Sequence, residues 1–135
     1  MTAKVKVGII GCGLMGTIHA RVIASLDTAE LVAFQDIEVR RAKRLAETFK
    51  ANYYTDYESL LRNKDIDAVV IATPEHLHRD PAIAAAEAGK HILLEKPIAT
   101  RIEDAEAIVN ACNRAKVKLM IAHTLRFDPR YYAIK

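Results

Sequence analysis

Short apolar runs alternate along the chain with segments in which apolar residues recur every three or four positions. Runs in which nearly every residue is apolar are typical of strands that are covered on both faces of a sheet. The strands that we predict on this basis are Val5–Ile10, Leu31–Gln35, Ala68–Ala72, His91–Leu94 and Val117–Ala122, with a weaker one near Asn52–Tyr54.

The segments between these runs have the period of amphipathic helices, so one stripe of each should face a core. The expected stripes are Met15, Ile18, Val22 and Leu26 in the first helix, Val39, Ala42, Ala46 and Phe49 in the second, and Ile102, Ala105, Val109 and Cys112 in the last. Residues that favour helix ends lie beside them. The predicted ends are an Asp56 cap before a short helix at Tyr57–Arg62, Asp80 with Pro81 starting a helix that Gly89 ends, and a Thr100–Glu103 capping box.

Strands that alternate with helices at this spacing predict parallel strands joined by right-handed crossovers, with helices on both faces of the sheet. The fold class expected is therefore α/β, a Rossmann-type doubly wound sheet. A length of 135 residues is that of one domain, and 51% hydrophobic with 27% charged residues excludes a disordered chain.

Charge and targeting signals narrow the function classes. The net charge of +3 is too small to favour nucleic acid or an anionic membrane as a partner. The sequence has no apolar run of the ~18 residues that span a membrane, and its first residues do not resemble a signal peptide. We therefore expect a soluble cytoplasmic domain in which Cys12 and Cys112 are reduced. His76 and His78 lack a third ligand at metal spacing, so no metal site is expected.

A glycine-rich segment follows the first predicted strand and opens the first helix. Gly11, Gly13 and Gly16 match the G-x-G-x-x-G pattern of dinucleotide-binding loops. The first glycine would make the tight turn, the second would let a pyrophosphate approach the backbone, and the third would let helix and strand pack closely. The pyrophosphate would lie at the positive end of the helix.

An acidic residue stands where such a site needs one. Asp36 ends the second predicted strand, at a spacing from the glycines at which a carboxylate accepts the adenosine ribose hydroxyls. This carboxylate would repel a 2′-phosphate and so favours NAD, although Arg40 and Arg41 keep NADP possible. Two alternatives stay open: Asp36 could cap the helix at Glu38–Lys50, and S-adenosylmethionine sites also use a glycine loop with a ribose-binding acid.

Three later segments place polar residues where predicted strands end, which in open α/β sheets is the edge that binds ligands. The first is Thr73–His78, which contains Pro74; the second is Glu95-Lys96-Pro97; and the third runs from His123 to Arg126.

Together with the glycine loop, these segments resemble the Gfo/Idh/MocA (glucose–fructose oxidoreductase, inositol dehydrogenase, MocA) family of oxidoreductases, with Glu95-Lys96-Pro97 as the most specific motif. The resemblance covers essentially the whole chain. It implies an NAD(P)-binding Rossmann domain at residues 1–122 and, at 123–135, the start of a connection to a C-terminal α+β domain. Because the sequence stops at Lys135, we expect the chain to be a fragment that is inactive alone.

The resemblance also implies roles for individual residues. Lys96 would be the catalytic or substrate-positioning lysine, and the Lys96–Pro97 bond is a candidate cis peptide. Oxidation of a hydroxyl needs a group that takes or polarises its proton, which a lysine in a cleft can do. The alternative to a catalytic role for Lys96 is a surface ion pair between Glu95 and Lys96. The expected dinucleotide contacts are Gly11, Cys12, Gly13, Leu14, Met15 and Gly16 in the loop, Asp36 at the ribose, Ala72, Thr73, Pro74 and His78 toward the nicotinamide ribose, and Glu95, Lys96 and Arg126 at the nicotinamide end.

The function expected is hydride transfer between NAD, or NADP, and a sugar, polyol or related hydroxy compound. Two other functions remain open, an NAD-dependent glycosidase of the same family and a stand-alone dinucleotide-binding module without catalysis. We also expect a homo-oligomer, with Tyr131, Tyr132 and Ile134 as apolar surface that self-associates in the fragment. His19 and His91 are interpreted as structural, and His123 could be either structural or functional.

Overall fold

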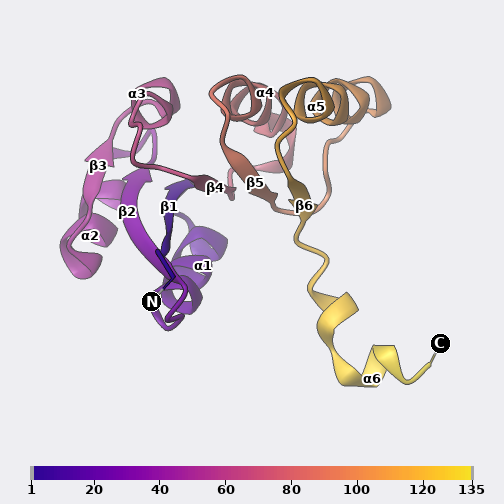
Figure 1. Cartoon of the computed structure of the whole chain (residues 1–135), viewed down its shortest axis with the longest axis horizontal. Coiled ribbons are helices and arrows are strands. Elements are labelled where there is room, and N and C mark those ends of the chain that lie inside the picture. Colours follow the sequence, from indigo (N-terminus) through magenta and orange to yellow (C-terminus); the bar gives the residue numbers. More distant parts are fainter. Residues whose placement is uncertain (1, 135) are drawn as a thin grey trace.

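Six parallel strands form one sheet in the order β3-β2-β1-β4-β5-β6 in the computed structural model, which describes residues 2–134 (Figure 1). Strand order reverses between β1 and β4, and this reversal is the switch point at which doubly wound sheets bind ligands. The strands are β1 (Val5–Ile10), β2 (Ala29–Gln35), β3 (Asn52–Tyr54), β4 (Ala68–Ile71), β5 (His91–Leu94) and β6 (Leu119–Ile121).

Helices cover both faces of the sheet, as predicted (Figure 1). Two helices pack on one face, and three pack on the other. The first pair is α1 (Leu14–Ala24) and α2 (Val39–Phe49); the second group is α3 (Tyr57–Leu61), α4 (Arg79–Glu87) and α5 (Ile102–Ala115). Three short helical segments lie in the loops or after β6: η1 (Glu75–Leu77), η2 (Thr124–Phe127) and α6 (Pro129–Tyr132).

The sheet separates two apolar cores. Ile9 of β1 belongs to the core beneath α1 and α2, whereas its neighbour Ile10 belongs to the core beneath the other three helices. Successive residues of a strand point to opposite faces, and nearly every residue of a central strand is therefore apolar. Both cysteines are free thiols and are buried in these cores.

All six predicted strands form, and three of them differ from the prediction in their bounds. Strand β2 begins two residues earlier than expected, at Ala29, and β4 ends one residue earlier, at Ile71. Strand β6 is shorter than predicted at both ends and covers only Leu119–Ile121. Helix α5 ends at Lys116 in the left-handed conformation (φ 56°), and the next amide, that of Val117, donates back to Cys112 O. Val117 and Lys118 therefore precede β6 and are not part of it.

The predicted stripe of α1 was wrong. Its buried residues are Gly16, Ala20 and Ile23, whereas Ile18 and Val22 are 40% and 53% exposed. The small residues face the sheet because Gly16 touches the backbone of the preceding loop, and this contact sets the rotation of the helix. The stripe of α5 was right at Cys112, but Ile108 and Ala111 are its other buried residues, and the predicted Ile102 and Val109 are exposed. The stripe of α2 was right at Ala42 and Ala46, while Val39 is exposed.

Two of the predicted helix starts were also wrong. Helix α5 begins after Arg101 without a side-chain cap, and Glu103 forms an ion pair with Arg101 and no capping box with Thr100. Helix α4 begins at Arg79, which places Asp80 and Pro81 inside its first turn, where a proline removes no helical hydrogen bond. The other predicted ends are correct: Asp56 accepts from the Ser59 amide at 2.7 Å, and Gly89 has φ +74°.

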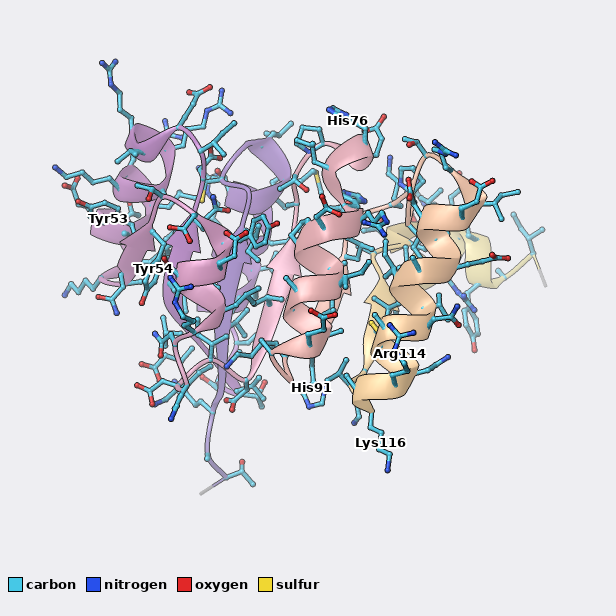
Figure 2. The ribbon with its side chains drawn as sticks, turned by 90° about the horizontal axis from the view of Figure 1, so that it is seen from above. Tyr53, Tyr54, His76, His91, Arg114 and Lys116 are labelled. Atoms are coloured by element: carbon cyan, nitrogen blue, oxygen red, sulfur yellow. The ribbon has the colours of Figure 1, made fainter. Side chains whose placement is uncertain are left out.

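At the edge of the sheet where the strands begin, hydrogen bonds of Lys90 and His91 stabilise the fold. Lys90 is 7% exposed, and its Nζ donates to the carbonyls of Asn63 and Ile66 at 2.9 and 2.8 Å. Burial lowers the pKa of this lysine. His91 accepts a hydrogen bond from the Lys118 amide, and Figure 2 shows it at the opposite end of the fold from His76. The structural interpretation of His91 is thus supported, and the loops near His76 belong to the other edge.

Candidate functional site

The glycine loop between β1 and α1 has the tight backbone geometry that its sequence predicts. Gly11 has φ +93°, and a Cβ there would lie 2.7 Å from the backbone carbon of Ala72 at the end of β4. A Cβ at Gly16 would overlap the Gly11 carbonyl oxygen. By contrast, a Cβ at Gly13 would meet nothing within 4 Å. The first and third glycines are therefore required by the fold, while the second leaves open space over the backbone.

The start of α1 presents amides toward that space. The Thr17 amide donates to Gly13 O at 3.0 Å, so the preceding N–H groups of the first turn have no partner within the helix. These groups and the helix dipole favour an anion such as a pyrophosphate. Met15 is partly buried and Leu14 is 78% exposed at the same turn.

Asp36 lies beside the loop and is 6% exposed. Its Oδ2 accepts from the Cys12 amide, and its Oδ1 accepts from the Glu38 amide, both at 2.8 Å. Asp36 is not the N-cap of α2, since that position is Glu38. The two amides hold the carboxylate at the end of β2, where it retains lone pairs for a ribose hydroxyl.

Cys12 contributes structure to the loop. Its side chain is 1% exposed, and its Sγ donates to Gln35 O at 3.3 Å. Burial, and then the nearby Asp36 charge, raises the pKa of the Cys12 thiol to about 12. The thiol is therefore neutral at physiological pH and is not a nucleophile.

A cavity of about 260 Å³ opens at the same edge of the sheet, next to the glycine loop. It brings together residues from α1, the ends of three strands and the loops after them. Its lining is Met15, Ala72, Thr73, Glu75, Glu95, Lys96, Ala122 and Thr124. Five of these residues were predicted site residues, whereas Glu75, Ala122 and Thr124 were not.

Thr73 offers an unused polar group at this wall. Its Oγ1 is buried and has no hydrogen-bond partner within residues 2–134. A buried hydroxyl without a partner is costly, so a ligand that hydrogen-bonds to it would be favoured.

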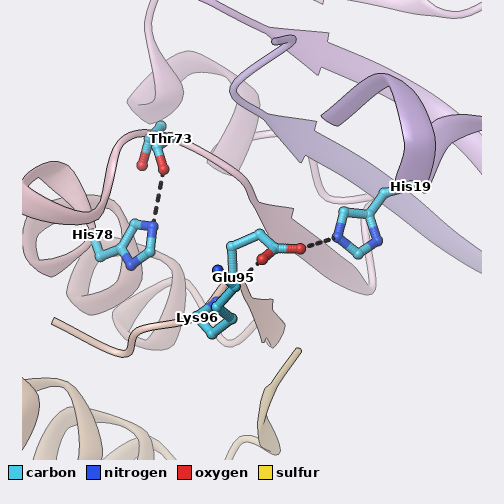
Figure 3. A network of polar contacts seen from close by, with 5 residues as sticks. All are labelled: His19, Thr73, His78, Glu95 and Lys96. Atoms are coloured by element: carbon cyan, nitrogen blue, oxygen red, sulfur yellow. Dashed lines mark hydrogen bonds and ion pairs between the residues drawn. The ribbon is translucent and has the colours of Figure 1, made fainter. Parts of the chain in front are cut away.

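His78 lies behind the wall and is 1% exposed. Its Nε2 lies 3.0 Å from Thr73 O (Figure 3). Its Nδ1 lies 2.9 Å from Pro97 O. The ring thus joins the loop after β4 to the loop after β5, where the Lys96–Pro97 peptide bond is cis. His78 holds the two loops together from inside the protein, and we find its side chain away from the cavity surface.

Glu95 is paired with a residue that the sequence analysis interpreted as structural. Its Oε1 lies 2.7 Å from Nε2 of His19, which projects from α1 (Figure 3). Within residues 2–134 no ion pair joins the side chains of Glu95 and Lys96, so the alternative interpretation of the motif as a surface ion pair is wrong. Lys96 is exposed at the cavity rim and keeps its ammonium available for a ligand. A signal for His19 did exist, because it lies one helical turn after Met15.

Arg126 is not part of this cavity. It lies on η2, after β6, on the wall of a second hollow of about 1180 Å³. That hollow also contains Phe127, Tyr131 and Tyr132, which are 52–74% exposed. Among residues 2–134, no group of three or more His, Cys, Asp or Glu side chains is arranged to hold a metal ion, and no helix is both long and apolar enough to cross a membrane.

Comparisons with known proteins agree with this geometry. The model of the Gfo/Idh/MocA oxidoreductase family, described as an NAD-binding Rossmann fold, matches residues 5–123. Myo-inositol 2-dehydrogenase of Thermotoga maritima is 30% identical over 131 residues, which are 96% of this chain and 39% of the relative.

Two solved structures are similar over nearly the whole chain. Scyllo-inositol dehydrogenase of Lactobacillus casei, with bound NAD(H) and scyllo-inositol, has a TM-score of 0.91 at 30% identity and is matched over 97% of this chain and 39% of its own. The WlbA dehydrogenase of Chromobacterium violaceum, in complex with NADH and UDP-GlcNAcA, has a TM-score of 0.96 at 31% identity. The match covers 100% of this chain and 39% of the WlbA chain. The chain therefore spans about two fifths of the length of the relatives that it matches.

Proposed function

This chain belongs to the Gfo/Idh/MocA family of oxidoreductases, and from that premise we propose that it binds NAD and serves an enzyme that oxidises or reduces a sugar, polyol or related hydroxy compound. The observation that carries the proposal is the alignment of the glycine loop, Asp36 and the Lys96 cavity along one edge of the sheet, across its switch point. Relatives that act on inositols or bind a UDP-sugar support this substrate class.

The residues present fit the cofactor. The open space over Gly13 and the amides at the start of α1 would hold the pyrophosphate, and Asp36 would accept the adenosine ribose hydroxyls. The unpartnered Thr73 hydroxyl would form a hydrogen bond with the nicotinamide ribose. Bound NAD supplies the hydride acceptor.

Lys96 is the proposed catalytic residue. Its ammonium is at the rim of the cavity and forms no ion pair with Glu95, so it is available to hydrogen-bond a substrate hydroxyl. A group that holds or takes the hydroxyl proton while hydride leaves the same carbon contributes the acid–base part of the reaction. His78 supports it from behind by holding the Lys96–Pro97 loop in place.

The test is made in an intact enzyme that contains this chain, and it compares Lys96→Ala with Lys64→Ala, a change of an exposed lysine outside the cavity. NAD affinity is measured by calorimetry, and turnover by NADH absorbance with inositols and sugar nucleotides as substrates. Lys96→Ala should lower turnover by about 100-fold or more and change NAD affinity by less than about threefold, since acid–base catalysis contributes 10²–10⁴-fold. Equal losses in both quantities would refute the catalytic role, and NAD binding without turnover on any substrate would favour a binding module.

We also propose NAD over NADP as the preferred cofactor. Asp36 is fixed by two amides, so it cannot easily turn away from a 2′-phosphate, whereas Arg41 is already paired with Glu38 at 3.1 Å. Asp36→Ser should lower the ratio of the NADP dissociation constant to the NAD dissociation constant by about tenfold, because the charge that repels the 2′-phosphate is removed. An unchanged ratio would contradict the assignment.

The assignment of residues 1–122 to nucleotide binding and of 123–135 to a connection rests on the extent of the family match. The exposed aromatic residues after β6 are consistent with a surface that packs against further protein. We propose that this surface makes the 135-residue chain self-associate, and a monomer in sedimentation at high concentration would oppose that proposal.

A further inference from the structure

A short side-chain contact beside the cavity joins two elements that are far apart in the sequence. Nε2 of His19, on α1, lies 2.7 Å from Oε1 of Glu95, which follows β5 directly (Figure 3). The two side chains are 15% and 8% exposed, so water screens the contact little. It is the link between the helix that carries the glycine loop and the motif that carries Lys96.

The other contacts of Glu95 leave its side chain dependent on this partner. The Glu95 backbone amide donates to Ile71 O at 2.9 Å and fixes the main chain at the end of the sheet. Its Oε2 accepts from the Lys96 amide, a longer contact of 3.2 Å. Oε1 has the His19 ring as its only hydrogen-bond partner within residues 2–134.

Loss of the imidazole would therefore change the cavity wall. A mostly buried carboxylate oxygen without a donor is unfavourable, so the Glu95 side chain would turn toward water. This movement alters the cavity wall next to Lys96. The glycine loop would be unaffected, because its contacts involve Gln35, Asp36 and Ala72 and not His19.

We propose that His19 is a positioning residue that holds the Glu95 carboxylate, and through it the Lys96 backbone, at the nicotinamide end of the site. The proposal rests on the proposed NAD-binding function. It assigns His19 to the nicotinamide half of the cofactor although the residue lies on the helix that binds the pyrophosphate.

Binding of two ligands distinguishes the positioning role of His19 from a role in stabilising α1 as a whole. ADP-ribose has the adenosine, the pyrophosphate and the second ribose of NAD and lacks the nicotinamide. Calorimetric titrations with NAD and with ADP-ribose are compared for the parent protein, His19→Leu and His19→Gln. Leucine fills the space without a donor, and the glutamine amide can donate to Glu95 as imidazole Nε2 does. Arg21→Gln, at an exposed position of α1, is the matched control.

His19→Leu should weaken NAD binding on the order of tenfold, the loss of about 1.4 kcal/mol, and leave ADP-ribose binding unchanged. His19→Gln should restore most of the NAD affinity, and Arg21→Gln should bind both ligands like the parent protein. Equal weakening of both ligands, or a glutamine variant that behaves like the leucine variant, would overturn the positioning role. A parent protein that binds neither ligand would instead overturn the proposed function, and this inference with it.

Discussion

The middle glycine of the β1–α1 loop separates cofactor binding from folding, and Gly13→Ala tests this directly. Gly13 has φ −79° and ψ −154°, an extended conformation that alanine also adopts, and the new methyl group would meet nothing within 4 Å. Alanine reduces the entropy of the unfolded chain by ~0.4–1 kcal/mol but is a poorer N-cap than glycine by a similar amount. The free energy of unfolding should therefore change by less than about 0.5 kcal/mol.

The affinity for NAD should respond very differently. The methyl group of Gly13→Ala would occupy the open space in which a pyrophosphate approaches the α1 amides. A hydrogen bond to a charged group contributes about 1.5–3 kcal/mol, so the loss of one such bond predicts an affinity decrease of about 10- to 100-fold.

Thermal unfolding and calorimetric titration with NAD measure the two effects on the same protein samples. Gly16→Ala is the contrasting variant, because its methyl group would overlap the Gly11 carbonyl oxygen and force α1 away from β1. It should lower the melting temperature by several degrees, as overpacking costs typically 1–3 kcal/mol. If Gly13→Ala binds NAD like the parent protein, or unfolds as readily as Gly16→Ala, then Gly13 does not separate cofactor binding from folding.

Three further predictions concern groups outside the cavity. Lys90→Met should lower the free energy of unfolding by about 2 kcal/mol in denaturant titration, since two buried carbonyls lose their donor, while Lys43→Met at an exposed position should have no effect. The Ser59 amide and hydroxyl lower the pKa of Asp56 below its ordinary 3.8, so its carboxylate contributes stability above that pH and loses it as the pH falls through the lowered value. Asp56→Asn should therefore show a shallower loss of melting temperature in acid than the parent protein, and identical profiles would contradict the assignment. Cys12, with a pKa of about 12, should resist iodoacetamide at pH ~8 in the folded protein and react only after denaturation, and mass spectrometry would detect an early adduct that disproves this.

Much of the architecture was predictable because it depends on local patterns. Nearly continuous apolar runs indicate strands that are covered on both faces, and the five such runs formed strands, as did the weaker one at Asn52–Tyr54. The glycine spacing predicted the loop, since the positive φ of Gly11 and the close approach at Gly16 tolerate no side chain. The polar residues that follow β4 and β5 met at one cavity because parallel strands place their carboxyl ends at the same edge.

Helix orientation was not predictable in the same way. Apolar periodicity favoured Ile18 and Val22 as core residues of α1, yet the buried face carries Gly16 and Ala20. The reason is that the distance between α1 and β1 depends on the backbone contact at Gly16, and a hydrophobicity pattern contains no information on such a contact.

The sequence by itself therefore determined which strand each candidate site residue follows. The glycine loop follows β1, the acid Asp36 follows β2, and Lys96 follows β5. Only the tertiary structure decided which side chains support them. His19 meets Glu95 across 76 positions, and the ring of His78 joins two loops from within. These contacts depend on the distances between packed elements, which are established by steric fit across the sheet and by the need to pair buried polar groups.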